Sequence, residues 1–212
     1  TLSQKFDSFS SQSNGILALD NWFWLGISWV FLKIVHESAH GLACKRFGGT
    51  IREAGVILIL FAPLAYVDVT SSCRFRSRWQ RIVTAGAGIY AELFVAAIAL
   101  LIWANIEAGL LKHVCHNVIT MASITTLVFN ANPLMRFDGY YILSDVLGIP
   151  NLYTNGQAFV QHVGRKYLLG LPSAFPHQRH RLITKAYGIA AFFWRILVSA
   201  SLILAASTMF DG

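Results

Sequence analysis

Two histidines and a glutamate lie close together in an apolar stretch near the start of the chain. His36, Glu37 and His40 form the pattern H-E-x-x-H inside residues 22–47, which we expect to be one long helix. Residues four apart on a helix share a face, so both imidazoles can reach one metal ion. Glu37 lies about 100° around the helix from His36, where it can take a proton from a water molecule at the metal. The pattern predicts a metal-dependent hydrolase.

A catalytic zinc site needs a third protein ligand and one open position. By residue type the candidates are Asp68, Glu92, His113, His116 and Asp138. We favour Asp138, because it follows the interrupted segment N-A-N-P-L-M-R-F-D-G, where irregular backbone can aim a carboxylate inward. Asp68 could instead contact a ligand of the metal. His113, Cys115 and His116 are expected in a surface turn.

The composition restricts the class of protein. The chain has 212 residues, of which 55% are hydrophobic and 13% are charged. An ordinary soluble domain carries about 25% charged residues, so the composition argues against a soluble globule, and a disordered chain would be far less hydrophobic. Three cysteines are too few for a disulfide scaffold. We expect a polar tail over residues 1–20 and one membrane-embedded metallopeptidase domain over residues 21–212.

The apolar segments predict an all-α integral membrane protein with about four membrane segments. These segments are residues 22–47, 82–106, 118–129 and 186–210. The third has only 12 residues before the polar break, about 18 Å of helix, which is short for a bilayer core of about 30 Å. Residues 53–70, rich in Val, Ile and Leu and divided by Pro63, predict a small β or re-entrant element between the first and second segments. Residues 151–171 predict an interfacial amphipathic stretch.

The basic residues predict how the chain is oriented in the membrane. Most of them lie between the first two segments or between the last two, whereas the opposite side holds only Lys5 and Lys112. Cytoplasmic loops carry an excess of Lys and Arg, so we expect both termini on the non-cytoplasmic side and the site nearer the cytoplasm. The expected location is the plasma or inner membrane of the cell. We interpret the net charge of +7 as a consequence of membrane topology, so we expect no nucleic-acid partner.

The paired motifs resemble a known family. H-E-S-A-H-G, followed about ninety residues later by N-x-x-P-x-x-x-x-D-G, resembles the site-2 protease family of intramembrane zinc metallopeptidases. The flanking sequences A-G-A-G-I-Y-A-E-L-F and N-P-L-M-R-F-D-G-Y-Y look most like its branch of peptide zinc metalloproteases. The resemblance implies one zinc ion per chain held by His36, His40 and Asp138, with Glu37 activating water. It also implies that Asn130 orients substrate or steadies the oxyanion.

The expected activity is hydrolysis of peptide bonds in membrane-embedded or membrane-associated polypeptides. The implied partners are a peptide or membrane-helix substrate, the lipid bilayer, and a membrane or export partner protein. The alternative is a non-catalytic membrane component of a peptide maturation or export system that retains a structural zinc site. Many family members read A-G-P-x-x-N where this chain has Glu92, and we expect Glu92 to form a buried pair with Arg195, which is alone in the last segment.

Overall fold

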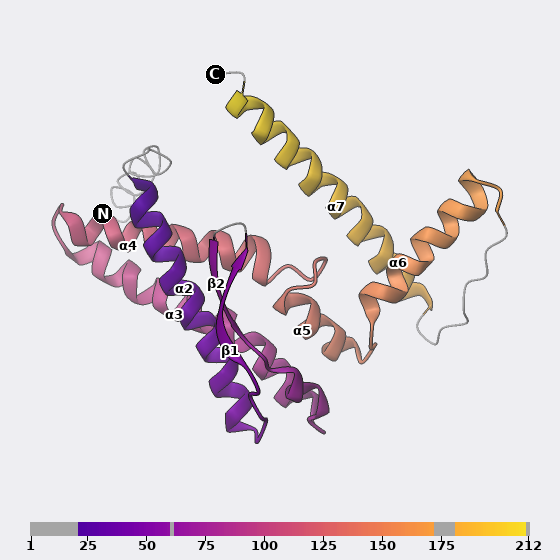
Figure 1. Cartoon of the computed structure of the whole chain (residues 1–212), viewed down its shortest axis with the longest axis horizontal. Helices are drawn as coiled ribbons and strands as arrows, with labels where there is room; N and C mark the ends of the chain where they lie inside the picture. The colour runs from indigo at the N-terminus through magenta and orange to yellow at the C-terminus, as the bar shows by residue number, and fades with distance from the viewer. Residues whose placement is uncertain (1–20, 60–61, 172–180, 211–212) are drawn as a thin grey trace.

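The computed structural model describes residues 21–59, 62–171 and 181–210, so the predicted polar tail lies outside the described residues. Within these ranges the protein is mostly helical, with six α-helices and one small sheet (Figure 1). The elements are α2 (Trp22–Arg46), β1 (Ala54–Ile59), β2 (Ala62–Val67), η2 (Thr70–Arg74), α3 (Arg78–Asn105), α4 (Leu110–Ser123), η3 (Ile124–Asn130), α5 (Asp138–Leu147), α6 (Leu152–Val163), η4 (Gly164–Leu168) and α7 (Arg181–Phe210).

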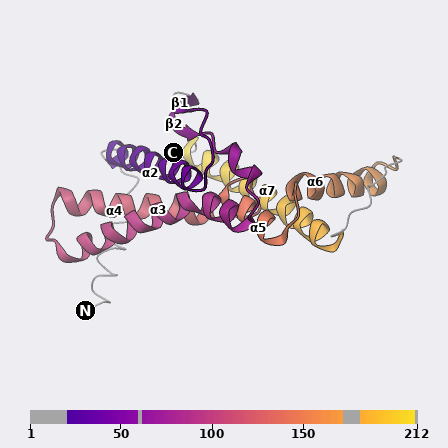
Figure 2. The same cartoon turned by 90° about the horizontal axis from the view of Figure 1, so that it is seen from below.

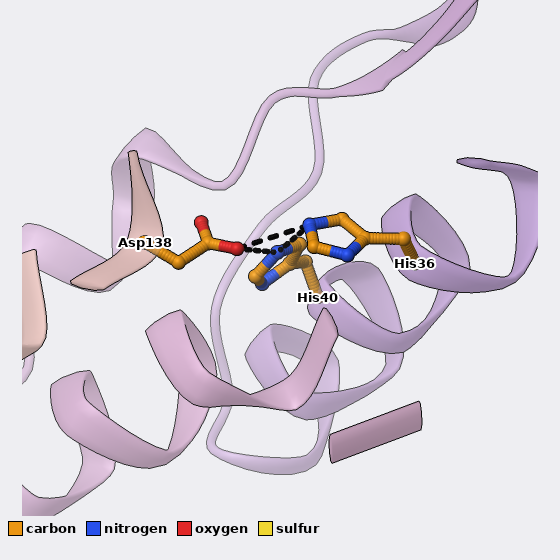
Figure 3. A group of neighbouring side chains, drawn as sticks. All are labelled: His36, His40 and Asp138. Atoms are coloured by element: carbon orange, nitrogen blue, oxygen red, sulfur yellow. Dashed lines mark hydrogen bonds and ion pairs between the residues drawn. The ribbon is translucent and has the colours of Figure 1, made fainter. Parts of the chain in front are cut away.

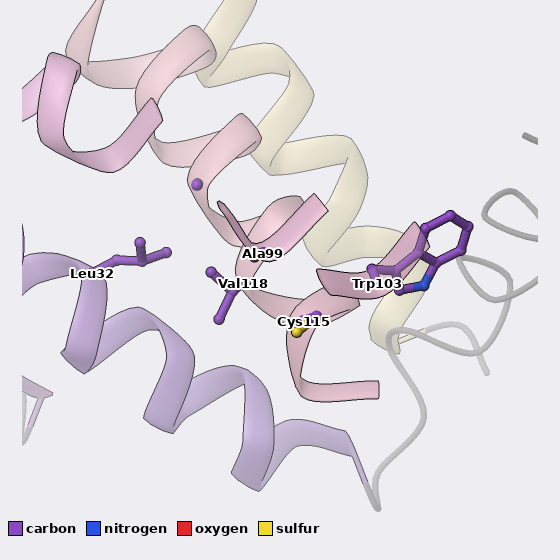
Figure 4. Close-up of a cluster of buried hydrophobic side chains, with 6 residues drawn as sticks. Leu32, Ala99, Trp103, Cys115 and Val118 are labelled. Atoms are coloured by element: carbon purple, nitrogen blue, oxygen red, sulfur yellow. The ribbon is translucent and has the colours of Figure 1, made fainter. Parts of the chain in front are cut away.

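Helices α2, α3 and α4 pack together and form one core of the molecule. Leu32 of α2 shares one buried cluster with residues of α3 and α4, namely Ala99, Trp103, Cys115, Val118 and Ala122 (Figure 4). Leu32 is fully buried, whereas most other large apolar side chains of α2 and α3 lie on the outside of this three-helix unit. The core therefore occupies one stripe of each helix and fixes how α2 faces α3.

The segment between α2 and α3 forms the predicted strand pair. Strands β1 and β2 are antiparallel, with Val56 opposite Ala65 and Leu58 opposite Pro63. Strand β2 packs against α2, where Val67 lies close to Gly41. Val56 and Leu58 of β1 are exposed. The hairpin is thus anchored to α2 through β2 and leaves β1 on the outside.

The third apolar segment is longer than its sequence suggests. Helix α4 begins at Leu110 and continues as the π-helix η3 to Asn130, so the helical run includes the polar residues upstream of the apolar core. His116 and Asn117 are buried, because they face the other helices rather than the outside. The break that the sequence predicts follows η3, and the chain becomes helical again only at Asp138.

Helices α6 and α7 pack on each other and, together with residues of α5, form a second unit; α5 also packs against α3 of the first unit (Figure 2). Its core comprises Tyr140, Ile149, Leu152, Tyr187 and Ala191. Gly156 of α6 and Gly188 of α7 let the two helices approach closely, because a Cβ at either position would meet the backbone of the other helix. The predicted amphipathic stretch is therefore helical over α6, and its side toward α7 is buried by close packing.

Two helices in the described part of the chain are long and apolar enough to span a membrane: α3, and residues 182–204 of α7. Four membrane segments were expected. Helix α2 has a sufficient length of 25 residues but carries Lys33, His36, Glu37 and His40. Helix α4 has only 14 residues before the chain changes to π-helix. The other two expected membrane segments are thus helical, but α2 is more polar and α4 is shorter than the two apolar helices.

Candidate metal centre

Helix α2 holds both histidines of the H-E-x-x-H pattern on its buried face. His36 is 3% exposed and His40 is 5% exposed. Their ring centroids lie 4.6 Å apart, and their Nε2 atoms lie 3.0 Å apart. This proximity follows directly from the four-residue spacing on a regular helix.

Asp138 completes the group from the first turn of α5. Its Oδ2 lies 3.0 Å from His36 Nε2 and 3.2 Å from His40 Nε2 (Figure 3). The three side chains form a group whose ligand atoms all lie within 4.8 Å of one another and could hold a metal ion. The backbone explains the approach: Gly139 lies against the Ala131 carbonyl, at a distance that leaves no room for a Cβ. Tyr187 of α7 donates to the Pro133 carbonyl at 3.0 Å and supports the same loop.

The spacing of these atoms suits a tetrahedral zinc site. Ligands about 2.0–2.1 Å from a zinc ion at tetrahedral angles lie about 3.3 Å from one another. The three observed distances, 3.0, 3.0 and 3.2 Å, are close to this value. Two imidazole nitrogens and one carboxylate are also a ligand set typical of catalytic zinc. The residues present therefore fit the metal that the sequence predicts.

The Nδ1 atoms of both histidines face protein groups, which leaves Nε2 directed toward Asp138. His40 Nδ1 lies 2.7 Å from the Thr84 carbonyl oxygen of α3, a distance at which it donates a hydrogen bond. His36 Nδ1 lies 3.2 Å from Glu92 Oε1, also on α3. Metal-binding histidines usually donate their second N–H to a carbonyl or carboxylate in this way. The contacts fix the orientation of both rings.

Glu37 lies beside the group rather than within it. Its half-buried side chain lines a cavity of about 320 Å³ that is also lined by His40 and Asp138. The other wall comes from the end of β2 and from α3 and α5, and includes Asp68 and Arg81. A carboxylate next to a metal-binding group and open to a water-sized space can act as a general base.

Two carboxyl groups of the cavity have lowered pKa values. Burial alone would raise the pKa of Asp138, but hydrogen bonds and charge interactions with His36 and His40 outweigh it and lower that pKa to about 2. The side-chain hydroxyl and the backbone N–H of Thr70 lower the pKa of Asp68. Arg81 donates to Asp145 at 2.6 Å, so its charge is compensated at the cavity wall. Both aspartates are thus carboxylates at neutral pH.

The structure separates the five candidates for the third ligand. Asp68 accepts a hydrogen bond from Thr70 and lies on the cavity wall. Glu92 lies behind His36, on the Nδ1 side. His113 contacts Asn21 at 2.7 Å, near the start of α2, and His116 is buried on α4. Among the described residues, Asp138 is the one that groups with the two histidines.

Two predictions about other residues are wrong. His113, Cys115 and His116 belong to helix α4 and not to a surface turn. Cys115 and His116 are buried where α4 packs on its neighbours, whereas His113 is exposed and contacts Asn21. Glu92 does not pair with Arg195. Arg195 Nη1 instead donates to the Tyr153 hydroxyl at 3.4 Å, within the second unit, which lies beside the unit that holds Glu92.

Asn130 lies inside the group of contacts behind His36. Its Nδ2 donates to Glu92 Oε2 at 3.2 Å and lies 3.4 Å from His36 Nδ1. The side chain is 5% exposed. Its expected role toward substrate stays a prediction. What the structure adds is a contact with the residues that support the metal ligands.

Sequence reasoning missed Gly88. A Cβ at this position of α3 would lie 2.5 Å from atoms of both His36 and His40, so only glycine leaves room for the two rings. The signal was present in A-G-A-G-I-Y, where small residues in a membrane helix often mark close packing.

Comparisons of the chain with models of protein families, with curated proteins and with solved structures found no match.

Proposed function

We propose that this protein is an intramembrane zinc metallopeptidase that hydrolyses peptide bonds of membrane-embedded polypeptides. The observation that carries the proposal is the convergence of His36, His40 and Asp138, with Glu37 on the wall of the adjoining cavity. A purely structural metal site has no use for a carboxylate beside it that is open to water. The position of Glu37 therefore favours a hydrolase over the structural alternative.

The chemistry divides between the metal and the chain. A zinc ion held by the three ligands would supply Lewis acidity, which polarises the scissile carbonyl and makes water more acidic. Glu37 takes the proton of the attacking water and returns it to the leaving amine. The cavity beside Glu37 gives the water and the peptide bond a place next to the ligand group. Since a peptide bond inside a helix is shielded, the substrate must unwind locally before cleavage.

A membrane location fits the surface of the helices. In α3 and α7, only 17% of the most apolar window is buried within the protein. A core helix of a soluble protein would bury most of such a window, whereas here Phe94, Leu101 and Leu202 are exposed, by 57%, 66% and 65%. We propose that lipid covers these side chains, and that α2 and the run α4–η3 complete four membrane segments.

The proposed orientation places the metal centre toward the cytoplasm. The basic residues at the end of α2 and before α3 would face that side by the excess of positive charge. His40 and His36 lie six and ten residues before Arg46, about 9–15 Å along the helix. The site would then lie below the cytoplasmic headgroups. Both termini would point away from the cytoplasm.

Metal analysis of detergent-purified protein tests the ligands and the base separately. Wild type is expected to hold near one zinc per chain, and Asp138→Ala is expected to hold much less. Glu37→Gln should retain zinc but cleave a fluorogenic membrane-spanning peptide about 10²–10⁴-fold more slowly, because it loses the general base. Glu107→Gln makes the same chemical change on an exposed residue and should behave as wild type.

Three outcomes would contradict the proposal. Equal zinc in wild type and in Asp138→Ala would move the third ligand elsewhere. A wild type without zinc would remove the metal centre. Zinc-loaded wild type with no cleavage above that of Glu37→Gln, over a panel of membrane-spanning peptides, would favour the structural zinc site.

A further inference from the structure

We infer that Glu92 is a positioning residue that holds His36 in the orientation required for metal binding. The inference rests on the proposed metal centre. Glu92 lies on α3, is fully buried, and approaches His36 from the side opposite the Asp138 carboxylate. It thus contacts one of the three ligands without belonging to the ligand group.

Hydrogen-bond donors from η3 hold one oxygen of Glu92. Thr125 Oγ1 lies 3.3 Å from Glu92 Oε2, Asn130 Nδ2 lies 3.2 Å from it, and Thr126 Oγ1 donates to the same atom. All three groups come from η3, where Thr126 is fully buried and the Thr125 hydroxyl also donates to the Met121 carbonyl at 2.9 Å. Because the donors converge on Oε2, the carboxylate plane is fixed and Oε1 remains on the side of His36.

The second oxygen faces the two basic groups of α2. Glu92 Oε1 lies 3.2 Å from His36 Nδ1 and 3.9 Å from Lys33 Nζ. Lys33 is one turn before His36 on the same face, and its side chain is 17% exposed. An ion pair with Lys33 offsets part of the cost of burying a carboxylate. Glu92 Oε1 has no hydrogen-bond partner among the described residues, so its interaction with these two basic groups is one of charge at close distance.

A negative charge beside Nδ1 determines what Nε2 can do. With Glu92 Oε1 3.2 Å from Nδ1, the charge favours the imidazole that carries its hydrogen on Nδ1, so the Nε2 lone pair points to the metal position and that nitrogen becomes a stronger ligand. His40 has the neutral Thr84 carbonyl in the equivalent place. The two histidines thus differ in the group beside Nδ1, which is a charged carboxylate for His36 and a neutral carbonyl for His40. A packing role alone would need neither the charge nor five polar neighbours.

The test compares metal affinity in purified protein that is stripped of metal and titrated with Zn²⁺ against a chromophoric chelator. Glu92→Gln is expected to bind zinc about 10–100-fold more weakly than wild type, because it keeps the size of the side chain but removes the charge. Titration with Co²⁺ gives a second readout, since its visible spectrum reports ligand geometry, and the bands of Glu92→Gln should shift. Glu107→Gln is the matched control and should match wild type in both.

A second variant keeps the test sharp if Glu92→Gln does not fold. Thr126→Val removes one donor to Oε2 at nearly the same volume, and zinc affinity should fall by a few-fold. Thr126→Ser retains the hydroxyl and should restore most of that loss. A purely structural role predicts instead that these variants lower the unfolding temperature while the zinc affinity and the Co²⁺ spectrum of the folded protein stay unchanged.

The outcomes separate this inference from the proposed peptidase. Wild type that binds zinc and cleaves peptides, with unchanged zinc affinity and Co²⁺ spectrum in Glu92→Gln, overturns the role of Glu92 alone. Weaker zinc binding in Glu92→Gln supports that role even if wild type cleaves nothing. A wild type that binds neither metal overturns both.

Discussion

Gly88 illustrates how single residues make the metal centre possible. The two imidazoles of α2 lie against α3 at this position, and a methyl group would overlap them. Glycine in a helix costs about 1 kcal/mol relative to alanine, so Gly88 makes α3 less stable than an alanine would. The space it leaves lets the Nε2 atoms of His36 and His40 approach Asp138.

Gly88→Ala should therefore disturb the site more than the fold. We expect zinc affinity to fall about tenfold or more, because the rings of His36 and His40 must move, and we expect overpacking to cost about 1–3 kcal/mol of unfolding free energy. Gly86→Ala is the control, since its Cβ would make an ordinary 3.6 Å contact with Ile142. Competition with a chelator and thermal unfolding in detergent measure both effects. Equal zinc affinity in the two variants would show that the close approach has no role in metal binding.

At the scale of elements, the β-hairpin presents an open edge on β1, whereas the end of β2 lines the cavity beside the candidate metal centre. The Asp68 N–H donates to the Glu53 carbonyl at 2.9 Å, which makes that pair a hydrogen-bonded one. Hydrogen-bonded and non-hydrogen-bonded pairs alternate along an antiparallel ladder, so the N–H groups of Val56 and Leu58 point away from β2. Pro63 sits opposite Leu58, where its missing N–H costs the ladder nothing. The free edge can accept an extended, locally unwound substrate.

Proline on this edge tests the substrate role. Val56→Pro removes an outward N–H without breaking a bond to β2, so zinc content should stay at the wild-type level while turnover of a membrane-spanning peptide falls about tenfold. Val56→Thr keeps the N–H and serves as the control. Unchanged turnover in the proline variant would show that the strand edge does not bind the substrate.

At the scale of the whole molecule, the polar site and the apolar surface face different surroundings. His36, His40 and Glu92 are buried where α2, α3 and η3 meet. Large apolar side chains cover the outside of α3 and α7. In a lipid bilayer this arrangement hides the ionisable groups and leaves the hydrocarbon in contact with apolar atoms. The basic residues around η2 would then mark the cytoplasmic face.

Cys73 provides a test of that orientation. It is exposed in η2 next to Arg74, whereas Cys44 and Cys115 are buried. A membrane-impermeant maleimide should label wild type in inside-out vesicles and not in right-side-out vesicles, because the basic loop is proposed to face the cytoplasm. Cys73→Ser should lose the label. Labelling from the outer side alone would reverse the proposed topology.

The sequence by itself determined what depends on local geometry. The four-residue spacing of His36 and His40 puts both rings on one helix face, Pro63 and the flanking β-branched residues favour a strand pair, and the polar segment before Asp138 ends a helix. Each of these features involves residues that are close in the chain, so helix and strand periodicity suffices to predict them. The expected membrane character likewise follows from composition, and two of the four expected segments are helices long and apolar enough to span a membrane.

Only the tertiary structure decided which distant residues meet. Asp138 was one of five candidates for the third ligand, and the packing of α5 against the loop at Ala131 selected it. Glu92 was expected beside Arg195, but the packing of α3 between α2 and η3 turns it toward His36. A buried charged side chain is stabilised by whichever opposite charge or hydrogen-bond donor lies next to it. For residues that are far apart in the sequence, helix packing decides which group that is. The spacing of residues along the chain does not encode this packing.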